Sequence, residues 1–238
     1  MQQRSNFSSK IGFVLAAAGS AVGLGNIWRF PYLAAKYGGG TFLLVYLILA
    51  VTFGFSLMVA EIAIGRKTGL SAIEAYKKLD KRFNFLGWLT ALVPTFILPY
   101  YSVIGGWVIK YFTVFATGGV EKSADSNYFV SFIAAPGEPL VWFALFVILT
   151  AVIVLFGVKN GIEKMSKILM PVLVVLTVII AVFVICQDGA MEGVIYYIKP
   201  NIKDFSAKTL LAAATQMFYS MSLAMGIMVT YGSYMKKE

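Results

Sequence analysis

The chain has 238 residues, of which 59% are hydrophobic and only 13% are charged, and its mean hydropathy is +0.80. This composition indicates a polytopic membrane protein rather than a soluble domain. The formal net charge of +9 does not point to a nucleic-acid partner, because the charges fall in short connections between apolar runs, as the positive-inside bias predicts. With no histidine and a single cysteine, Cys186, the sequence excludes disulfide frameworks, Cys/His metal sites and Cys/His catalytic pairs within the chain.

The first apolar segment, residues 11–28, contains an unusual cluster of three glycines, a serine and an asparagine within 19–26. Each glycine costs about 1 kcal/mol of helix propensity relative to alanine, so we expect the helix to break near residues 21–25 and then resume. Non-helical backbone at membrane depth persists only where protein or a polar cavity receives its freed groups. Close helix packing through Gly19 and Gly23, which have the small-xxx-small spacing, is the alternative interpretation.

Five further apolar segments predict six membrane-spanning helices in total. Apart from the first, these spans are expected near residues 41–65, 85–116, 140–156, 168–186 and 208–234. Basic residues gather at the N-terminus, in the connections 66–82 and 157–167, and at Lys236 and Lys237, whereas acidic residues are more frequent in the other connections. The positive-inside bias therefore places both ends of the chain in the cytoplasm.

The sixth span carries a second interruption, at residues 220–226, where serine, alanine and glycine cluster again. Four unbroken spans separate the two interruptions. Paired interruptions at corresponding positions of two halves indicate the binding site of a transporter, because unwound backbone supplies ligands at the centre of the membrane.

The run from Gly19 to Pro31 closely resembles the first-helix signature of the neurotransmitter:sodium symporter family, in its bacterial, leucine-transporter-like branch of amino-acid transporters. The resemblance covers essentially the whole chain, through Gly38-Gly39-Gly40, Glu61 with Gly65-Arg66, Tyr100-Tyr101, Trp107 and the run 216–234.

Family members have about twelve helices in an inverted-repeat architecture. The resemblance therefore implies an all-α membrane protein with a single membrane domain over residues 1–238. Helices 1–5, about 11–186, would form the first repeat, and helix 6, about 208–235, would open the second, with helices 1 and 6 unwound at mid-membrane. On this interpretation the chain is the N-terminal half of a transporter, and helices 7–12 are absent from it.

The function implied by the resemblance is sodium-coupled import of a neutral, apolar α-amino acid by alternating access, in the plasma (bacterial inner) membrane. Sodium ions would be needed and no organic cofactor, and the expected partners are the amino acid, membrane lipid and a C-terminal half, but no nucleic acid. The oligomeric state stays open. A non-transporting amino-acid sensor or assembly subunit, or a non-functional fragment, are the alternatives. An enzyme is disfavoured, because the predicted spans hold no nucleophile–base pair.

The resemblance also implies two sodium sites. The first would use the Ala21 carbonyl, the side chains of Asn26 and Ser220, and the substrate carboxylate. The second would use the carbonyls of Gly19 and Val22, with its remaining ligands in helix eight. An inter-helix hydrogen bond is the alternative role for Asn26.

For the amino acid, the resemblance implies backbone and side-chain contacts in both breaks. The carboxylate would meet the N–H groups of Leu24 and Gly25, where a helix N-terminus favours an anion. Gly23 stands where amine-transporting relatives place an aspartate, which favours an α-amino acid over an amine. The remaining implied contacts are Ala21, Ile97, Tyr101, Tyr219, Ser220, Ser222 and Met225. Tyr101 could also be a packing residue, and Ala224 replaces a glycine common in close relatives.

Gating residues implied by the resemblance lie at both ends of the pathway. Outside, Arg29 would pair with Gln216 above the substrate, while Tyr101 and Tyr219 close an aromatic lid. In the family an acidic residue of helix ten completes this outer gate. Inside, the gate would be Arg4 with Phe7 and Tyr234, where Phe7 replaces the usual tryptophan; a membrane-surface anchor is the alternative role for Arg4.

Three further residues have implied structural roles. Gly161 and Pro171 would mark a segment of helix five that can unwind, although a proline in a first turn is otherwise ordinary. Glu61 is the one acidic residue in a predicted span. It would accept hydrogen bonds from unwound backbone; a proton relay is disfavoured, because it would need partners that these spans lack.

Overall fold

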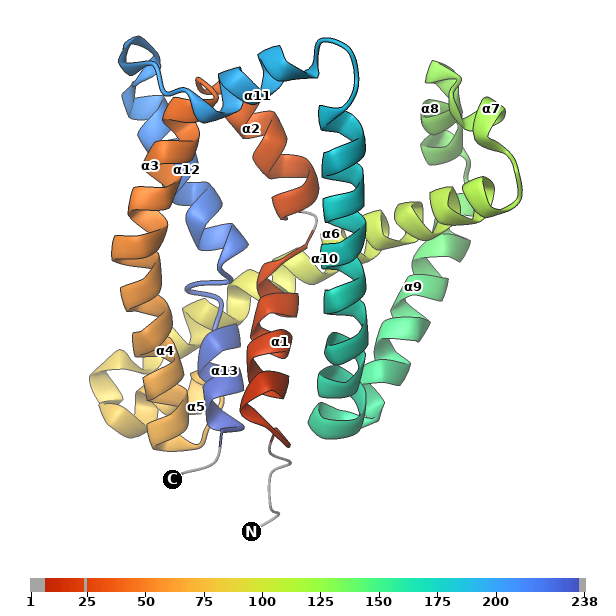
Figure 1. Cartoon of the computed structure of the whole chain (residues 1–238). Helices are drawn as coiled ribbons and strands as arrows, with labels where there is room; N and C mark the ends of the chain where they lie inside the picture. Colours follow the sequence, from red (N-terminus) through yellow and green to blue (C-terminus); the bar gives the residue numbers. More distant parts are fainter. Residues whose placement is uncertain (1–6, 24, 236–238) are drawn as a thin grey trace. The chain divides into compact units, whose positions relative to one another are not determined.

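A computed structural model describes residues 7–23 and 25–235 of the chain (Figure 1), and within these ranges all regular structure is helical. The prediction of an all-α fold is therefore confirmed. The chain divides into two compact units, Met1–Ala91 with Val158–Glu238 and the intervening Leu92–Gly157. The first of the two boundaries falls inside one long helix, Asn84–Ala116.

The first unit opens with the predicted broken helix. Helix α1 (Lys10–Ala21) is capped by Ser9, whose hydroxyl accepts a hydrogen bond from the Gly12 N–H at 3.0 Å. The chain resumes as a π-helical turn, Gly25–Arg29, which runs into α2 (Phe30–Lys36). The helix axes before and after the break differ by 53°. The expected interruption near residues 21–25 is confirmed.

Long apolar helices follow the broken one. Helices α3 (Gly40–Leu49) and α4 (Phe55–Thr68) form one span, joined by a π-helical turn over Ala50–Gly54. The other long helices are α6 (Asn84–Ala116), α9 (Glu138–Leu155) and α10 (Lys164–Ile185). Among the described residues, four helices are long and apolar enough to cross a membrane, or five if the bent pair counts as one.

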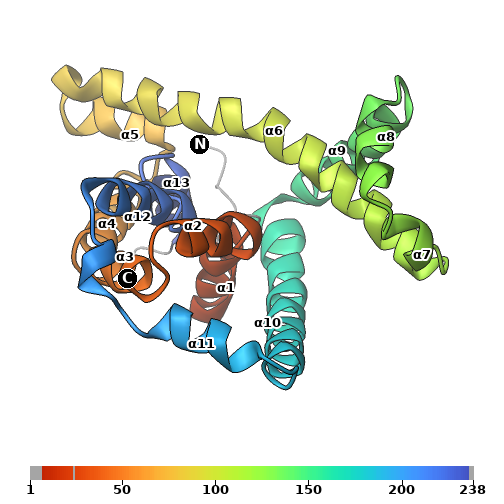
Figure 2. The ribbon, with the colours of Figure 1, turned by 90° about the horizontal axis from the view of Figure 1, so that it is seen from above.

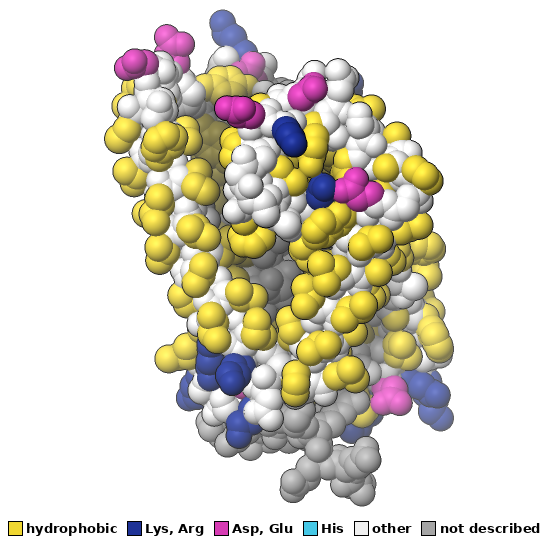
Figure 3. All heavy atoms as spheres, turned by 90° about the vertical axis from the view of Figure 1, so that its right-hand side faces the viewer, with side chains coloured by type: hydrophobic (Ala, Val, Ile, Leu, Met, Phe, Trp, Pro, Cys, Tyr) yellow, Lys and Arg dark blue, Asp and Glu magenta, His cyan; other side chains and the backbone are white. Residues whose placement is uncertain are grey.

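These helices carry apolar side chains on their exposed sides. Figure 3 shows hydrophobic side chains along the helices and charged side chains gathered toward helix ends. Such a surface suits a protein surrounded by lipid.

The sixth predicted span is built from two short helices, α12 (Ala207–Ser220) and α13 (Ile227–Ser233). Between them Ser222 and Ala224 adopt left-handed backbone with φ of 53° and 59°. This conformation costs a residue with a side chain roughly 1–2 kcal/mol, so contacts elsewhere must hold it. The interruption expected within residues 220–226 is confirmed, whereas the total of six spans stays a prediction.

Within the first unit, α12 packs on α3, and α13 packs on α4 (Figure 2). Glycines bring the second pair close: a Cβ on Gly65 would lie 1.9 Å from the Val229 carbonyl oxygen, and one on Gly232 would lie 2.4 Å from the Ile62 carbonyl oxygen. Backbone therefore meets backbone between α4 and α13. Shorter elements complete the unit, namely α5 (Ala72–Leu79), α11 (Ala190–Ile198) and the 3-10 turns Lys81–Phe83 and Ile202–Asp204.

The second unit contains most of α6, then α7 (Val120–Ser123), α8 (Ser126–Ala134) and α9. Gly105 and Gly106 let α9 approach the backbone of α6 closely. A Cβ on Gly106 would lie 2.7 Å from the Phe143 backbone nitrogen. The ammonium of Lys110 pairs with Glu138 and lies 5.6 Å from the ring centre of Trp142. These contacts fix α9 to α6.

Replacing Gly65 with alanine is expected to destabilise the fold by about 1–3 kcal/mol, because the new methyl group overlaps backbone atoms that cannot rotate away. Thermal unfolding of the purified protein in detergent measures this. The control is Gly193→Ala in α11, where a Cβ meets nothing within 4 Å. An equal melting temperature for the Gly65 variant and the native protein would contradict the close backbone packing.

Candidate functional site

The two helix breaks meet each other in the first unit. The Ser222 hydroxyl donates a hydrogen bond to the Ser20 carbonyl at 2.9 Å, and the Gln216 side-chain amide donates to the Gly25 carbonyl at 2.9 Å. Contact is close, since a Cβ on Gly25 would lie 2.2 Å from the Tyr219 ring. Unwound backbone from helices distant in sequence therefore lines one region.

Asn26 lies at the edge of this region with an unsatisfied oxygen. Its amide nitrogen donates to the Ala21 carbonyl at 3.2 Å, while its Oδ1 is buried and has no hydrogen-bond partner among the described residues. Leaving a buried polar atom without a hydrogen-bond partner costs free energy, which indicates that a ligand completes its contacts. Amide and carbonyl oxygens are neutral ligands of the kind that a hard cation takes, and Asn26 and Ala21 bring one of each to this break. The residues present therefore fit a sodium ion.

Ser220 ends α12 with two hydrogen bonds. Its hydroxyl donates to the Gln216 carbonyl at 2.7 Å, so the Tyr46 hydroxyl, 2.8 Å away, acts as the donor toward it. The sequence analysis did not single out Tyr46, because it lies within a predicted span and belongs to no recognisable motif. The Gln216 side chain is fully buried, and its Oε1 has no partner in the described part of the chain.

Glu61 supports the second break. Its side chain is buried, and one carboxylate oxygen accepts a hydrogen bond from the Ala224 N–H at 2.7 Å. The other oxygen, Oε2, has no partner within the described ranges. Glu61 thus satisfies backbone that the left-handed turn at Ala224 removes from the helix ladder.

On the α2 side of the first break, the guanidinium of Arg29 lies 5.3 Å from the ring centre of Tyr219. Gln216 is bonded to Gly25, as above, so its expected pairing with Arg29 stays a prediction. Ile97 and Tyr101 lie on the part of α6 that belongs to the second unit. Leu24 and Arg4 lie outside the described residues.

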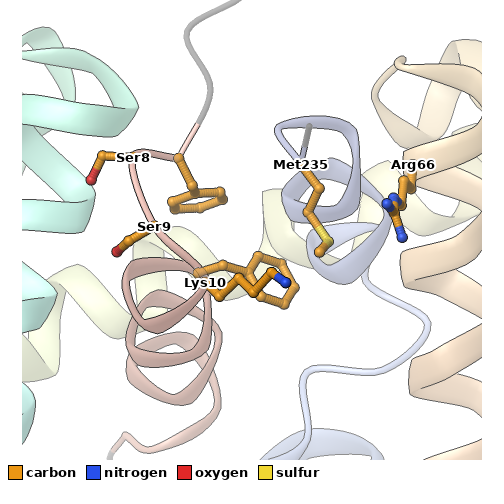
Figure 4. A pocket seen from close by; sticks show the side chains of 7 residues that line it. Ser8, Ser9, Lys10, Arg66 and Met235 are labelled. Atoms are coloured by element: carbon orange, nitrogen blue, oxygen red, sulfur yellow. The ribbon is translucent and has the colours of Figure 1, made fainter. Parts of the chain in front are cut away.

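The opposite end of α1 is closed by aromatic contacts. Phe7 is buried, its ring centre lies 5.8 Å from that of Tyr231 and 6.2 Å from that of Tyr234, and its N–H donates to the Tyr234 carbonyl at 3.2 Å. A cavity of about 380 Å³ adjoins it (Figure 4). The cavity is lined by Phe7, Ser8, Ser9, Lys10, Phe13, Arg66 and Met235.

The remaining predicted residues lie in α1, in and just before α10, and in the second break. Val22 ends α1 with φ −92° and ψ 106°, and a Cβ on Gly19 would lie 3.5 Å from Met170. Gly161 lies in a π-helical turn, Val158–Glu163, and Pro171 lies inside α10. Met225 belongs to the second break. The helix therefore departs from regular α geometry at Gly161.

Two interrupted helices that meet beside neutral oxygen ligands, among long apolar helices, define an integral membrane protein of the leucine-transporter type. Residues 4–128 and 124–238 match the sodium:neurotransmitter symporter family, and the chain belongs to this family.

Individual relatives agree with this assignment. The chain is 39% identical over 241 residues to the uncharacterized sodium-dependent transporter YhdH of Bacillus subtilis, covering 99% of this chain and 53% of the relative. It is 30% identical over 269 residues to the human sodium-dependent neutral amino acid transporter SLC6A17, covering 100% and 37% respectively.

A solved structure is also similar. The crystal structure of MhsT in complex with L-phenylalanine superposes with a TM-score of 0.90 at 42% identity, covering 98% of this chain and 54% of that one. The chain thus spans about half the length of YhdH and MhsT, and a smaller share of the human relative. The prediction of family and fold is confirmed.

Proposed function

We propose that the chain forms the N-terminal half of a sodium-coupled symporter, which imports a neutral, apolar α-amino acid by alternating access. The observation that carries the proposal is the buried, unpaired Oδ1 of Asn26 beside the Ala21 carbonyl, within a broken helix. Membership of a family of sodium-dependent transporters supports it.

In this proposal Ala21, Asn26 and Ser220 hold one sodium ion together with the substrate carboxylate. The carbonyls of Gly19 and Val22 supply part of a second site, which the C-terminal half completes. Sodium prefers oxygen ligands of this kind. Because the protein ligands are neutral, the negative charge that balances the ion comes from the substrate carboxylate. Substrate and ion then strengthen each other's binding, which is the physical basis of coupling.

The amino acid lies between the two breaks in this proposal. Its carboxylate docks on the N–H groups of Leu24 and Gly25 and on the Tyr101 hydroxyl. Its amine meets the carbonyls of Ala21, Tyr219 and Ser220 and the hydroxyl of Ser222. The side chain occupies a space bounded by Ile97 and Met225, and phenylalanine, bound in the MhsT structure, is a substrate of the expected kind.

Access alternates when Arg29, Gln216 and the aromatic residues open on one side, and Arg4, Phe7 and Tyr234 open on the other. The breaks act as hinges, because unwound residues absorb changes in φ and ψ that a continuous helix resists. In this proposal the chain lies in a bacterial inner membrane, surrounded by lipid, and both of its ends face the cytoplasm.

The test is uptake of radiolabelled phenylalanine into proteoliposomes by the transporter that carries this chain. Uptake is expected only in the presence of an inward-directed sodium gradient. Undiminished uptake in sodium-free buffer under a pH gradient would contradict sodium coupling. Sodium-dependent binding without counterflow of labelled substrate would instead indicate an amino-acid sensor.

A further inference from the structure

The carboxylate of Glu163, at the start of α10, is attached mainly to the segment that begins α1. Its Oε2 accepts a hydrogen bond from the Ser8 N–H at 2.7 Å, and the Ser8 hydroxyl also bonds to its Oε1. Lys167, one helical turn along, donates to Oε1 at 2.6 Å. The Glu163 side chain is 1% exposed, so these contacts are what satisfies a buried charge.

The face of α1 is shaped to admit this carboxylate. A Cβ on Gly12 would lie 2.0 Å from the Glu163 Oε1, so any larger residue there forces the carboxylate to move. Ser9 contributes twice: its hydroxyl caps α1 by accepting from the Gly12 N–H, and it lies 3.5 Å from Oε1. In Figure 4 the hydroxyls of Ser8 and Ser9 point away from Met235 and Arg66.

The other sides of this segment are held less firmly. Phe7 contacts α13 through its ring and one backbone hydrogen bond, and the cavity of about 380 Å³ separates the start of α1 from Arg66 of α4 (Figure 4). At its far end α1 stops at the break after Ala21. The Ser20 and Ala21 carbonyls there accept hydrogen bonds from Ser222 and Asn26. Because the helix is interrupted at this point, α1 can tilt about these contacts without carrying α2, provided that its start is released.

Helix α13, the corresponding half of the second broken helix, is held in a different way. It lies backbone to backbone against α4 at Gly65 and Gly232. Interlocked backbone does not separate in small steps, whereas a group of side-chain hydrogen bonds has two states, formed and broken. Of the two half-helices, α1 is the one whose attachment includes a buried group of side-chain hydrogen bonds.

We propose that Glu163 is a positioning residue that latches α1 to α10 and keeps the cytoplasmic side closed. The latch consists of Ser8, Ser9, Glu163 and Lys167. Release of the two serines from the carboxylate frees α1 to move and opens the path from the sodium and substrate site to the cytoplasm. This inference rests on the proposed alternating-access function, and it adds a residue to the inner gate of Arg4, Phe7 and Tyr234.

The experiment measures how readily a cysteine in the closed contact is reached from the cytoplasm. Ala16, which is 1% exposed in α1 beside Phe7 and Val158, is the reporter position. In a Cys186→Ser background, Ala16→Cys is labelled in inside-out vesicles with a membrane-impermeant maleimide. Glu163→Gln is expected to raise the labelling rate about tenfold, the change in an opening equilibrium that one charge-assisted hydrogen bond of ordinary strength produces.

Two further variants probe the same contact. Gly12→Ala should act in the same direction, because its methyl group displaces the carboxylate. Ser8→Ala by itself should raise the labelling rate. Combined with Glu163→Gln it should raise the rate little further, as expected for two residues that share one contact. Full additivity of these two changes would contradict a shared latch.

Controls separate the latch from a general loss of structure. Glu74→Gln removes an exposed glutamate of α5 and should leave Ala16→Cys labelling unchanged. A second reporter, Ala213→Cys, lies fully buried in the core between α3 and α12 and should stay unlabelled in Glu163→Gln. Unchanged labelling at Ala16→Cys, or an equal rise at both reporters, would overturn the proposal. Failure of sodium-dependent uptake by the native protein would count against the proposed function instead.

Discussion

Replacing Asn26 with alanine is expected to abolish sodium-dependent uptake at ordinary sodium concentrations. In the structure the Asn26 side-chain nitrogen donates a hydrogen bond to the Ala21 carbonyl. Its Oδ1 is buried and has no partner among the described residues. In the proposed function that oxygen is a sodium ligand. Losing one charge-assisted contact costs about 1.5–3 kcal/mol, which is roughly 10- to 150-fold in sodium affinity.

The measurement is the sodium concentration that gives half-maximal phenylalanine uptake in proteoliposomes. Asn26→Asp keeps an oxygen at the same place and should retain more sodium affinity than Asn26→Ala, which a packing role would not explain. Asn127→Ala, in the exposed part of α8, is the matched control and should behave like the native protein. An unchanged half-saturating sodium concentration in Asn26→Ala would remove Asn26 from the sodium site.

The position of the first helix break could be predicted from the sequence, because its cause is local. Three glycines within residues 19–26 make helix costly whatever surrounds them, and the structure breaks there. The second break was a weaker prediction, since serine and alanine tolerate a helix. In the structure Ser222 and Ala224 adopt positive φ, and the buried Glu61 receives the Ala224 N–H. Tertiary contact, not local preference, thus fixes that turn.

Contacts between distant residues could not be predicted in this way. Ser8 and Glu163 are 155 positions apart, and Tyr46 and Ser220 are 174 apart. Neither pair has a spacing that a helix or turn imposes, and each partner alone resembles an ordinary residue of a helix end or an apolar span. Their meeting depends on how the helices pack, which a pattern along one chain does not encode. The resemblance to the family supplied the proposed ligand residues, but it did not indicate the proposed latch.

Amines that lack a carboxylate are expected to compete poorly for the proposed site. Gly23 provides no side-chain carboxylate, and its carbonyl accepts hydrogen bonds from the N–H groups of Asn26 and Ile27. The ligand must therefore bring its own carboxylate, both for the sodium ion and for the N–H groups that begin the outer half-helix. Losing that charged group costs about 1.5–3 kcal/mol, so phenethylamine should bind roughly 10- to 150-fold more weakly than phenylalanine.

Lysine should also compete poorly, for a different reason. It keeps the α-carboxylate and the α-amine, but its second ammonium would enter a space for which the proposed lining is Ile97, Tyr219, Ser222 and Met225, none of them charged. Burying an unpaired charge costs several kcal/mol, whereas the flexible Met225 can adapt to apolar groups of different size. Competition against labelled phenylalanine in the complete transporter measures both effects. Leucine and tryptophan should displace the label at low concentration, and tighter binding of tyramine or lysine than of these two would contradict a neutral, apolar α-amino acid as the substrate.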